Sequence, residues 1–377
     1  MKLLHTSDWH LGAMDGNRSL LEDQRFFIDE ICNIIKEYSV TAVIIAGDVY
    51  DRSVSSVEAI KLYDYAMTRF CGELKTPTII IAGNHDSAER LSSCKDLLSS
   101  AGLYISGSLE NEISKVSLEN CEIYLLPWIT EEKVKSIYPD KKDEIKSLED
   151  AYKVVTDDMR QHFDKSKKHI IVSHAFITDS ETSTSDRAAV IGFATQVSAS
   201  VFDGFDYVAL GHIHMPQNIK ENIRYSGTPM PYSFGKEETQ EKSVTIIDTD
   251  DMSQTIVPIP LLHKRKTLTG TLEELINYEC TDEIKNGYIR LKVTDQYVGL
   301  EALSELKRVF PNVLEVSGKT FEGDTTSVTL TLDELEHLET SPINVFKYFC
   351  KEEMDLEPDD HIIKLFEDAI STNKEGK

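Results

Sequence analysis

The chain has 377 residues, of which 40% are hydrophobic and 28% are charged, as expected for a globular protein with a full core. Its 40 basic and 65 acidic residues give a formal net charge of −25. This charge argues against unaided binding of a polyanion, because phosphate affinity comes from Lys and Arg. About half of the negative excess lies in residues 271–377. The apolar runs are too short to span a bilayer, and the N-terminus lacks a signal-peptide pattern, so no membrane association is expected.

The cysteines are scattered and include no CxxC pair, which excludes a disulfide framework and zinc-finger spacing. We expect free thiols in a reducing compartment, the cytoplasm. The six cysteines are Cys32, Cys71, Cys94, Cys121, Cys280 and Cys350.

The first hundred residues alternate strand-like and helix-like patterns. Residues 2–6, 41–47 and 76–83 are apolar runs typical of strands. Between the first two runs, the spacing of Leu20, Phe27, Ile31 and Ile34 predicts one face of a helix. Ser55 and Glu58 form a capping-box pattern for a second helix. This βαβαβ order predicts a parallel sheet.

The pattern becomes richer in strands after residue 103. We expect strands at 121–128, 168–174 and 206–212, a mostly helical insertion at about 130–165, and a hairpin over 243–260. The predicted fold class is therefore α/β: a sandwich of two sheets flanked by helices.

The stretch 258–268 resembles a domain boundary, because prolines and charges cluster there. Beyond it, a capping box at Thr271 and Glu274 and alternating strand and helix patterns predict a small α+β domain. Two helical patterns follow in an acidic tail. The expected division is a first domain at 1–265, a small capping domain at 266–340 and a helical tail at 341–377.

Polar clusters follow five of the β-like runs. In a parallel sheet the carboxyl ends of strands share one edge, so these clusters are expected to converge. Five of the eleven histidines belong to them. The clusters consist of Asp8 and His10; Asp48 and Asp51; Asn84, His85 and Asp86; His174; and His212 and His214.

These residue types suit a metal centre. Asp, Asn and neutral His offer oxygen and nitrogen ligands without cysteine, which favours manganese, iron or zinc. In D-x-H and H-x-H, alternate side chains on an extended backbone share a face, so both can reach one small volume. The preceding glycines at 47, 83 and 211 allow tight turns and close backbone approach.

Each motif taken alone is ambiguous. A lone D-x-H is a weak signal for a metal, and a lone GNHD is also compatible with a turn. The combination of all five motifs in order at strand ends favours a metal site over a structural explanation. The other histidines belong to no cluster and are expected at the surface or in packing: His5, His162, His169, His263, His337 and His361.

The motif series D-x-H, G-D-x-x-D, G-N-H-D, H and G-H-x-H resembles that of the calcineurin-like metallophosphoesterase superfamily. Two stretches, residues 191–217 and 224–238, resemble more closely its SbcD branch, bacterial nuclease subunits paired with the SbcC ATPase. The superfamily motifs cover roughly residues 1–250, and the closer resemblance extends more weakly into the small domain.

The resemblance implies two divalent ions, most simply Mn²⁺, with Asp48 bridging them. It assigns Asp8, His10, Asp48 and His214 to one ion, and to the other Asp48, Asn84, His174 and His212. It further implies that His85 acts on the transition state or leaving oxygen. Asp51 and Asp86 are expected to orient histidines or loop backbone.

The function that the resemblance implies is metal-dependent cleavage of DNA in repair and recombination, as exonuclease and endonuclease. The expected partners are DNA and an SbcC-type ATPase, with the chain as a homodimer in a heterotetramer. The ATPase then supplies most of the basic DNA surface, which explains the acidic charge. Two alternatives remain: a protein phosphatase or small-molecule phosphodiesterase of the same superfamily, since "GDVYDRS" resembles the phosphatase form, and a scaffold with an inactive site.

Overall fold

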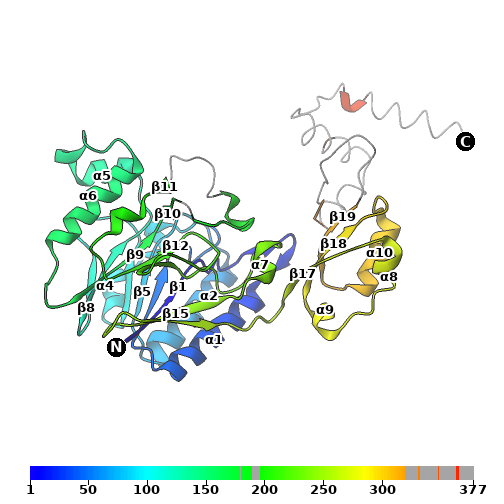
Figure 1. Cartoon of the computed structure of the whole chain (residues 1–377), viewed down its shortest axis with the longest axis horizontal. Coiled ribbons are helices and arrows are strands. Elements are labelled where there is room, and N and C mark those ends of the chain that lie inside the picture. Colours follow the sequence, from blue (N-terminus) through cyan, green and yellow to red (C-terminus); the bar gives the residue numbers. More distant parts are fainter. Residues whose placement is uncertain (179, 189–195, 319–329, 332–346, 348–361, 365–377) are drawn as a thin grey trace, which may run out of the picture. The chain divides into compact units, whose positions relative to one another are not determined.

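The computed structural model describes residues 1–178, 180–188 and 196–318, and the short pieces 330–331, 347 and 362–364. These residues form two compact units, which are treated separately (Figure 1). The first contains Met1–Asp15 and Ser19–Leu262. The second contains the hairpin tip Gly16–Arg18 and the described residues from His263 onwards.

The first unit contains two six-stranded mixed sheets. The first sheet has the order β16-β15-β1-β4-β5-β6, in which β1, β4, β5 and β6 are parallel and β15 and β16 form the predicted antiparallel hairpin. Its strands are β1 (Lys2–Thr6), β4 (Ala42–Ala46), β5 (Thr78–Ile81), β6 (Leu103–Ser106), β15 (Ser243–Asp248) and β16 (Gln254–Pro258).

The second sheet has the order β13-β14-β12-β9-β8-β7. Strands β8, β9, β12 and β14 are parallel, with antiparallel strands at both edges. The strands are β7 (Lys115–Ser117), β8 (Cys121–Leu126), β9 (Lys168–His174), β12 (Tyr207–Gly211), β13 (Gln217–Lys220) and β14 (Ile223–Tyr225).

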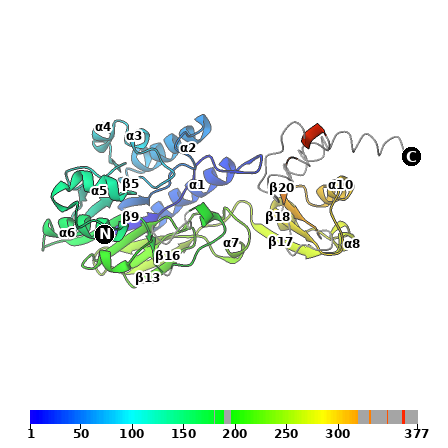
Figure 2. The same cartoon turned by 90° about the horizontal axis from the view of Figure 1, so that it is seen from above.

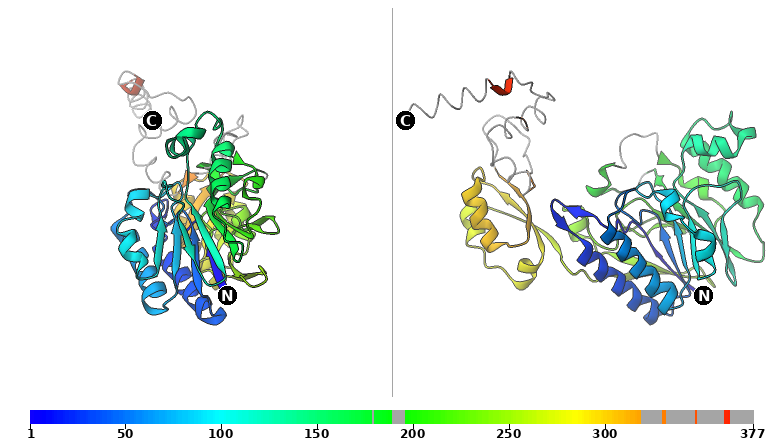
Figure 3. Two further views of the ribbon diagram at one scale, coloured as in Figure 1. Left: turned by 90° about the vertical axis from the view of Figure 1, so that its left-hand side faces the viewer. Right: turned by 180° about the vertical axis from the view of Figure 1, so that it is seen from behind.

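The two sheets pack face to face around an apolar core. Leu3, Ile44 and Ile79 of the first sheet meet Ile123, Val172 and Ala209 of the second, and all six are buried. Because both faces of the central strands are covered, their sequences are continuously apolar rather than alternating. The predicted sandwich of two sheets flanked by helices is confirmed (Figure 3).

Helix α1 (Leu21–Tyr38) and helix α2 (Val57–Met67), which continues as the π-helix η1 (Thr68–Glu73), cover the outer face of the first sheet (Figure 2). The predicted apolar face of α1 is buried. The capping box predicted at Ser55 is wrong by one residue. Ser56 is the cap and accepts a hydrogen bond from the Ala59 N–H at 3.1 Å, whereas the Ser55 hydroxyl donates to the Arg52 carbonyl.

The predicted helical insertion is present on the second sheet. It consists of α5 (Glu131–Ile137), η2 (Pro139–Lys141) and α6 (Leu148–Gln161), and α6 buries Tyr152, Val155 and Met159. The smaller elements of the first unit are β2 (Met14–Asp15), β3 (Arg18–Ser19), α3 (Ala88–Leu91), α4 (Lys95–Ser99), β10 (Phe176–Ile177), η3 (Ser185–Ala188), β11 (Gln196–Val197), η5 (Ala199–Phe202) and α7 (Lys236–Thr239).

The second unit is a four-stranded sheet with helices, ordered β17-β18-β19-β20. The predicted capping box is confirmed at Thr271 and Glu274. The tail at 341–377 lies outside the described residues except for 347 and 362–364. The elements are β17 (Arg265–Gly270), α8 (Leu272–Ile276), α9 (Asp282–Asn286), β18 (Tyr288–Val293), α10 (Leu300–Val309), β19 (Val313–Ser317) and β20 (Leu330–Thr331).

Within the described ranges, no helix has the length and apolar character needed to cross a membrane.

Candidate metal centre

The predicted ligands converge at the carboxyl ends of parallel strands from both sheets, where α/β folds place their sites. Asp8 and His10 follow β1, Asp48 follows β4 and Asn84 follows β5. From the facing sheet, His174 ends β9, and His212 and His214 follow β12. The sandwich thus brings together residues more than 200 positions apart.

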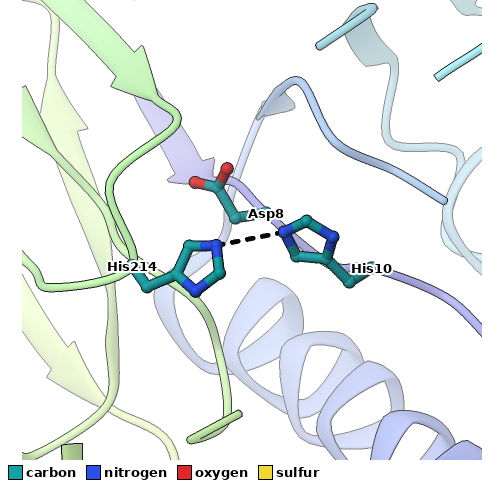
Figure 4. A group of neighbouring side chains, drawn as sticks. All are labelled: Asp8, His10 and His214. Atoms are coloured by element: carbon teal, nitrogen blue, oxygen red, sulfur yellow. Dashed lines mark hydrogen bonds between the residues drawn. The ribbon is translucent and has the colours of Figure 1, made fainter. Parts of the chain in front are cut away.

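One donor group contains Asp8, His10 and His214. All three residues are buried, and each offers a ligand atom within 4.8 Å of the others. The two Nε2 atoms of His10 and His214 lie 3.1 Å apart (Figure 4). The Asp8 carboxylate also accepts the backbone N–H of His212 at 2.9 Å, which ties the two sheets together beside the site.

A second donor group surrounds the Asn84 amide oxygen. His174 Nε2 lies 3.1 Å from Asn84 Oδ1, and His212 Nδ1 lies 3.0 Å from the same atom. The two imidazole nitrogens are 3.3 Å apart. This group therefore contributes one oxygen and two nitrogens to a single small volume.

Asp48 lies between the two groups. Its Oδ2 is 3.3 Å from His174 Nε2 and 3.8 Å from His10 Nε2. Its Oδ1 accepts the backbone N–H of His85 at 2.9 Å, which fixes the carboxylate plane. One oxygen of Asp48 is therefore within reach of both donor groups.

The donor set suits divalent cations. His174 Nδ1 is 2.8 Å from the Ala46 carbonyl and donates to it, so a neutral His174 presents a lone pair at Nε2. That lone pair faces two further acceptors, Asn84 Oδ1 and Asp48 Oδ2. Positive charge here, either a proton on His174 or a bound cation, relieves the repulsion between these atoms, and this mixture of oxygen and nitrogen donors matches divalent transition metals.

Burial and charge tune the ionisation of these groups. Burial lowers the pKa of His10, and burial lowers the pKa of His212 to about 3, so both rings favour the neutral, ligating form. Burial also opposes protonation of His174, but the facing Asp48 carboxylate raises the pKa of that ring to about 9. Burial would raise the pKa of Asp48, yet His174 holds it below its usual range. The site thus stabilises positive charge beside Asp48.

The site is built on strained backbone. Asp8, His10, Asp48 and His212 all have positive φ, at 54°, 43°, 47° and 104°. Such conformations cost about 1–3 kcal/mol each in non-glycine residues and persist where the surrounding structure imposes them. Here the residues with this conformation are the ones whose side chains form the two donor groups.

Two glycines leave the space that the site needs. A Cβ at Gly83 would lie 2.1 Å from Asp48 Oδ1, and a Cβ at Gly211 would lie 1.9 Å from the Ala46 carbonyl oxygen. Neither atom could be accommodated without moving backbone. The expectation that these glycines permit close approach agrees with this geometry.

Asp86, Asp51 and His85 occupy the rim of the site. The Asp86 carboxylate accepts the backbone N–H groups of Gly83, Val49 and Tyr50 at 2.9–3.1 Å, so it joins the loops after β4 and β5. Asp51 Oδ1 lies 3.8 Å from His10 Nδ1, and the Asp51 backbone carbonyl accepts from His85 Nδ1 at 2.8 Å. This contact holds the His85 ring through its Nδ1.

The structure places further residues at the site that belong to none of the five motifs. Trp128 stacks on His212 with ring centroids 5.3 Å apart. Ser185 and Asp186 contact His214, and Glu237 contacts Ser185. Only the block 224–238, which contains Glu237, stood out in the sequence. The other contacts depend on tertiary structure.

Comparisons with known proteins show the family of the chain. Residues 1–216 match the calcineurin-like phosphoesterase family, and residues 262–354 match the family described as the Type 5 capsule protein repressor C-terminal domain. The chain is 33% identical over 326 residues to the SbcD subunit of the nuclease SbcCD from Staphylococcus epidermidis, covering 85% of this chain and 86% of that protein.

Among solved structures, a dimetal phosphatase from Danio rerio aligns with a TM-score of 0.38 and 12% identity, covering 69% of this chain and 99% of that one. The fold and the site define the class as a metal-dependent phosphoesterase. The chain belongs to the calcineurin-like phosphoesterases and, within them, to the family of SbcD nuclease subunits.

Proposed function

We propose that this chain hydrolyses phosphodiester bonds of DNA at a centre of two Mn²⁺ ions, as a double-strand exonuclease and single-strand endonuclease acting in DNA repair and recombination. The observation that carries the proposal is the position of Asp48 Oδ2 between two complete donor groups. Seven ligand-type side chains are more than one ion needs.

The proposed ligand sets follow the two groups. Asp8, His10 and His214 with Asp48 hold one ion, and the other is held by Asn84, His174 and His212 with Asp48. When bound, two such ions supply Lewis-acid stabilisation to a phosphoryl group and activate water.

The remaining chemistry belongs to the protein. His85 donates Nδ1–H to the Asp51 carbonyl, so the doubly protonated ring has its second proton, at Nε2, to transfer to the leaving oxygen. Asp86 holds the two loops that carry Asp48 and His85 in register. Trp128 and Phe176 pack against the His212 ring and limit the orientations it can adopt.

The proposed partners are DNA and an SbcC-type ATPase, with the chain as a homodimer in a heterotetramer. This assembly accounts for the net charge of −25, because the ATPase then contributes the basic surface that DNA requires. The match of residues 262–354 supports a nuclease subunit over a protein phosphatase or small-molecule phosphodiesterase.

The test is cleavage of linear duplex, single-stranded circular DNA and a phosphopeptide with Mn²⁺, with and without the ATPase. Cleavage of both DNAs and not of the peptide is expected. Asp48→Ala should abolish cleavage and lower bound manganese from two ions per chain, whereas Asp203→Ala, at an exposed carboxylate, should behave as wild type. Cleavage of the peptide alone, or one ion per chain in the folded wild type, contradicts the proposal.

A further inference from the structure

A buried ion pair lies behind His214 and takes no part in the chemistry described above. Lys242 Nζ and Glu237 Oε2 are 2.7 Å apart, and both side chains are fully inaccessible to solvent. Burying two charges costs free energy even when they pair, so such a pair is often neutral or unfavourable compared with apolar residues. Its position beside a predicted metal ligand suggests that it serves the site.

The hydrogen bonds around Glu237 have one possible direction. Its Oε2 accepts from Lys242 and from the backbone N–H of Tyr232, and its Oε1 accepts from the hydroxyls of Ser185 and Ser233 at 2.5 and 2.6 Å. An ionised carboxylate can only accept. The hydroxyl proton of Ser185 therefore points to Glu237.

This direction determines the tautomer of His214. Ser185 Oγ is also 2.6 Å from His214 Nδ1. Because its proton is already donated to Glu237, Ser185 Oγ must accept from Nδ1–H. A neutral ring protonated at Nδ1 carries its lone pair at Nε2, and His214 Nε2 is the atom that faces His10.

We propose that Glu237 and Ser185 form a relay that positions His214, fixing the tautomer whose Nε2 is free to bind a metal ion. The inference rests on the proposed role of His214 as a ligand. Lys242 anchors the relay and also donates to the His214 carbonyl at 3.1 Å, while Asp186 accepts the His214 backbone N–H at 3.0 Å. The same Asp186 oxygen lies 3.6 Å from His214 Nδ1, so this carboxylate favours the same tautomer as the relay.

Glu237→Gln tests the direction of the relay without changing its shape. Lys242 can only donate, so the glutamine oxygen must replace Oε2 and its NH₂ must replace Oε1. The NH₂ then donates to Ser185, whose hydroxyl is free to donate to His214 Nδ1 or to Ser183 Oγ at 2.8 Å. Donation to His214 favours the Nε2–H tautomer, which has no lone pair facing His10.

Two measurements read the outcome. Long-range ¹H–¹⁵N spectra of ¹⁵N-histidine-labelled, EDTA-treated protein report the tautomer directly, with the His214 signal assigned by its loss in His214→Gln. Mn²⁺ titration reports affinity. Wild type should show the Nδ1–H tautomer, and Glu237→Gln should show the Nε2–H tautomer. Ser185→Ala and Glu237→Gln should each lower the affinity for the Mn²⁺ ion at Asp8, His10 and His214 by about 10–100-fold, as is typical for residues supporting a metal-ligating histidine.

Ser233→Ala is the matched control. The Ser233 hydroxyl donates to the same Glu237 oxygen as Ser185, but the hydrogen bond to His214 Nδ1 is made by Ser185. It should keep the wild-type tautomer and Mn²⁺ affinity. Equal losses in Ser233→Ala and Ser185→Ala, or an Nδ1–H signal in Glu237→Gln, would overturn the relay.

If Glu237→Gln does not fold, Ser185→Ala still tests the proposal, because replacing Ser185 leaves the Lys242–Glu237 ion pair intact. Wild-type Mn²⁺ affinity in a folded Ser185→Ala protein also overturns the proposal. Failure of the underlying function gives a different result: the wild-type protein shows the Nδ1–H tautomer but binds no manganese.

Discussion

Individual residues at this site are constrained by space as much as by chemistry. The backbone of Gly83 passes so close to Asp48 that a single added carbon would overlap both its carboxylate and its amide nitrogen, at 2.1 and 2.4 Å. Asp48 itself has a positive φ of 47°, a strained conformation for a residue other than glycine.

We expect Gly83→Ala to displace Asp48 and weaken Mn²⁺ binding at least tenfold, with a loss of about 1–3 kcal/mol in unfolding free energy from overpacking. Isothermal titration and urea unfolding measure the two effects. Gly72→Ala is the control, because its new Cβ would meet only Thr68 Cγ2 at 3.8 Å. Wild-type manganese affinity in Gly83→Ala would show that Asp48 tolerates the displacement.

The role of His85 can be separated from metal binding. Its Nδ1 is held by a backbone carbonyl, and only its backbone N–H contacts Asp48. His85→Ala should therefore retain metal and DNA affinity while cleavage falls by about 10²–10⁴-fold, the usual contribution of a general acid. His214→Ala should lose metal and activity together. Metal content, DNA binding and cleavage measured on one preparation distinguish these outcomes, and loss of metal from His85→Ala would make it a ligand instead.

At the scale of elements, the two sheets are joined by buried polar contacts as well as by apolar packing. His5 on β1 reaches across to β12, where Nδ1 meets the Tyr207 hydroxyl at 3.0 Å and Nε2 meets the Leu210 carbonyl at 3.1 Å. Burial, with the nearby Arg224, lowers the pKa of His5 to about 3. The contact is thus made by a neutral ring.

This shift predicts a pH-dependent stability. The unfolded chain binds a proton at His5 below about pH 6.5, whereas the folded chain does not do so until about pH 3. Stability is therefore full well above pH 6.5 and falls as the pH falls, by about 1.6 kcal/mol between pH 6.5 and 5 from this residue. Urea unfolding in EDTA should show a steeper pH dependence for wild type than for His5→Gln. Parallel curves would mean that His5 is protonated in the folded protein.

For the whole molecule, we predict from the sequence that the acidic tail binds the proposed ATPase partner. Val345, Phe346 and Phe349 share one helical face in the sequence, and Ile362, Leu365 and Phe366 share another. Deletion of residues 341–377 should leave a folded, metal-loaded protein that no longer co-purifies with the ATPase. Undiminished co-purification would show that the tail packs on its own chain.

Much of the architecture follows from local patterns in the sequence. The apolar runs before Asp8, Asp48 and Asn84 predicted parallel strands, and the predicted sandwich is what forms. Helix α1 and the capping box at Thr271 were predictable because hydrophobic periodicity and caps are local properties. The cap of α2 was not, because the capping-box pattern selects Ser55 with Glu58, whereas in the fold Ser56 caps the helix and Ala59 stands three residues further on.

The sequence alone determined the chemistry of the site: which residue types end the strands, and hence that a metal centre was expected at one sheet edge. Only tertiary structure decided how those residues are held. The relay from Lys242 through Glu237 and Ser185 to His214 joins segments with no shared spacing, and the neutral state of His5 depends on a strand of the opposite sheet. A sequence pattern describes the periodicity of one segment. The hydrogen-bond partners of His214 and the burial of His5 depend on contacts between segments that are far apart in the sequence.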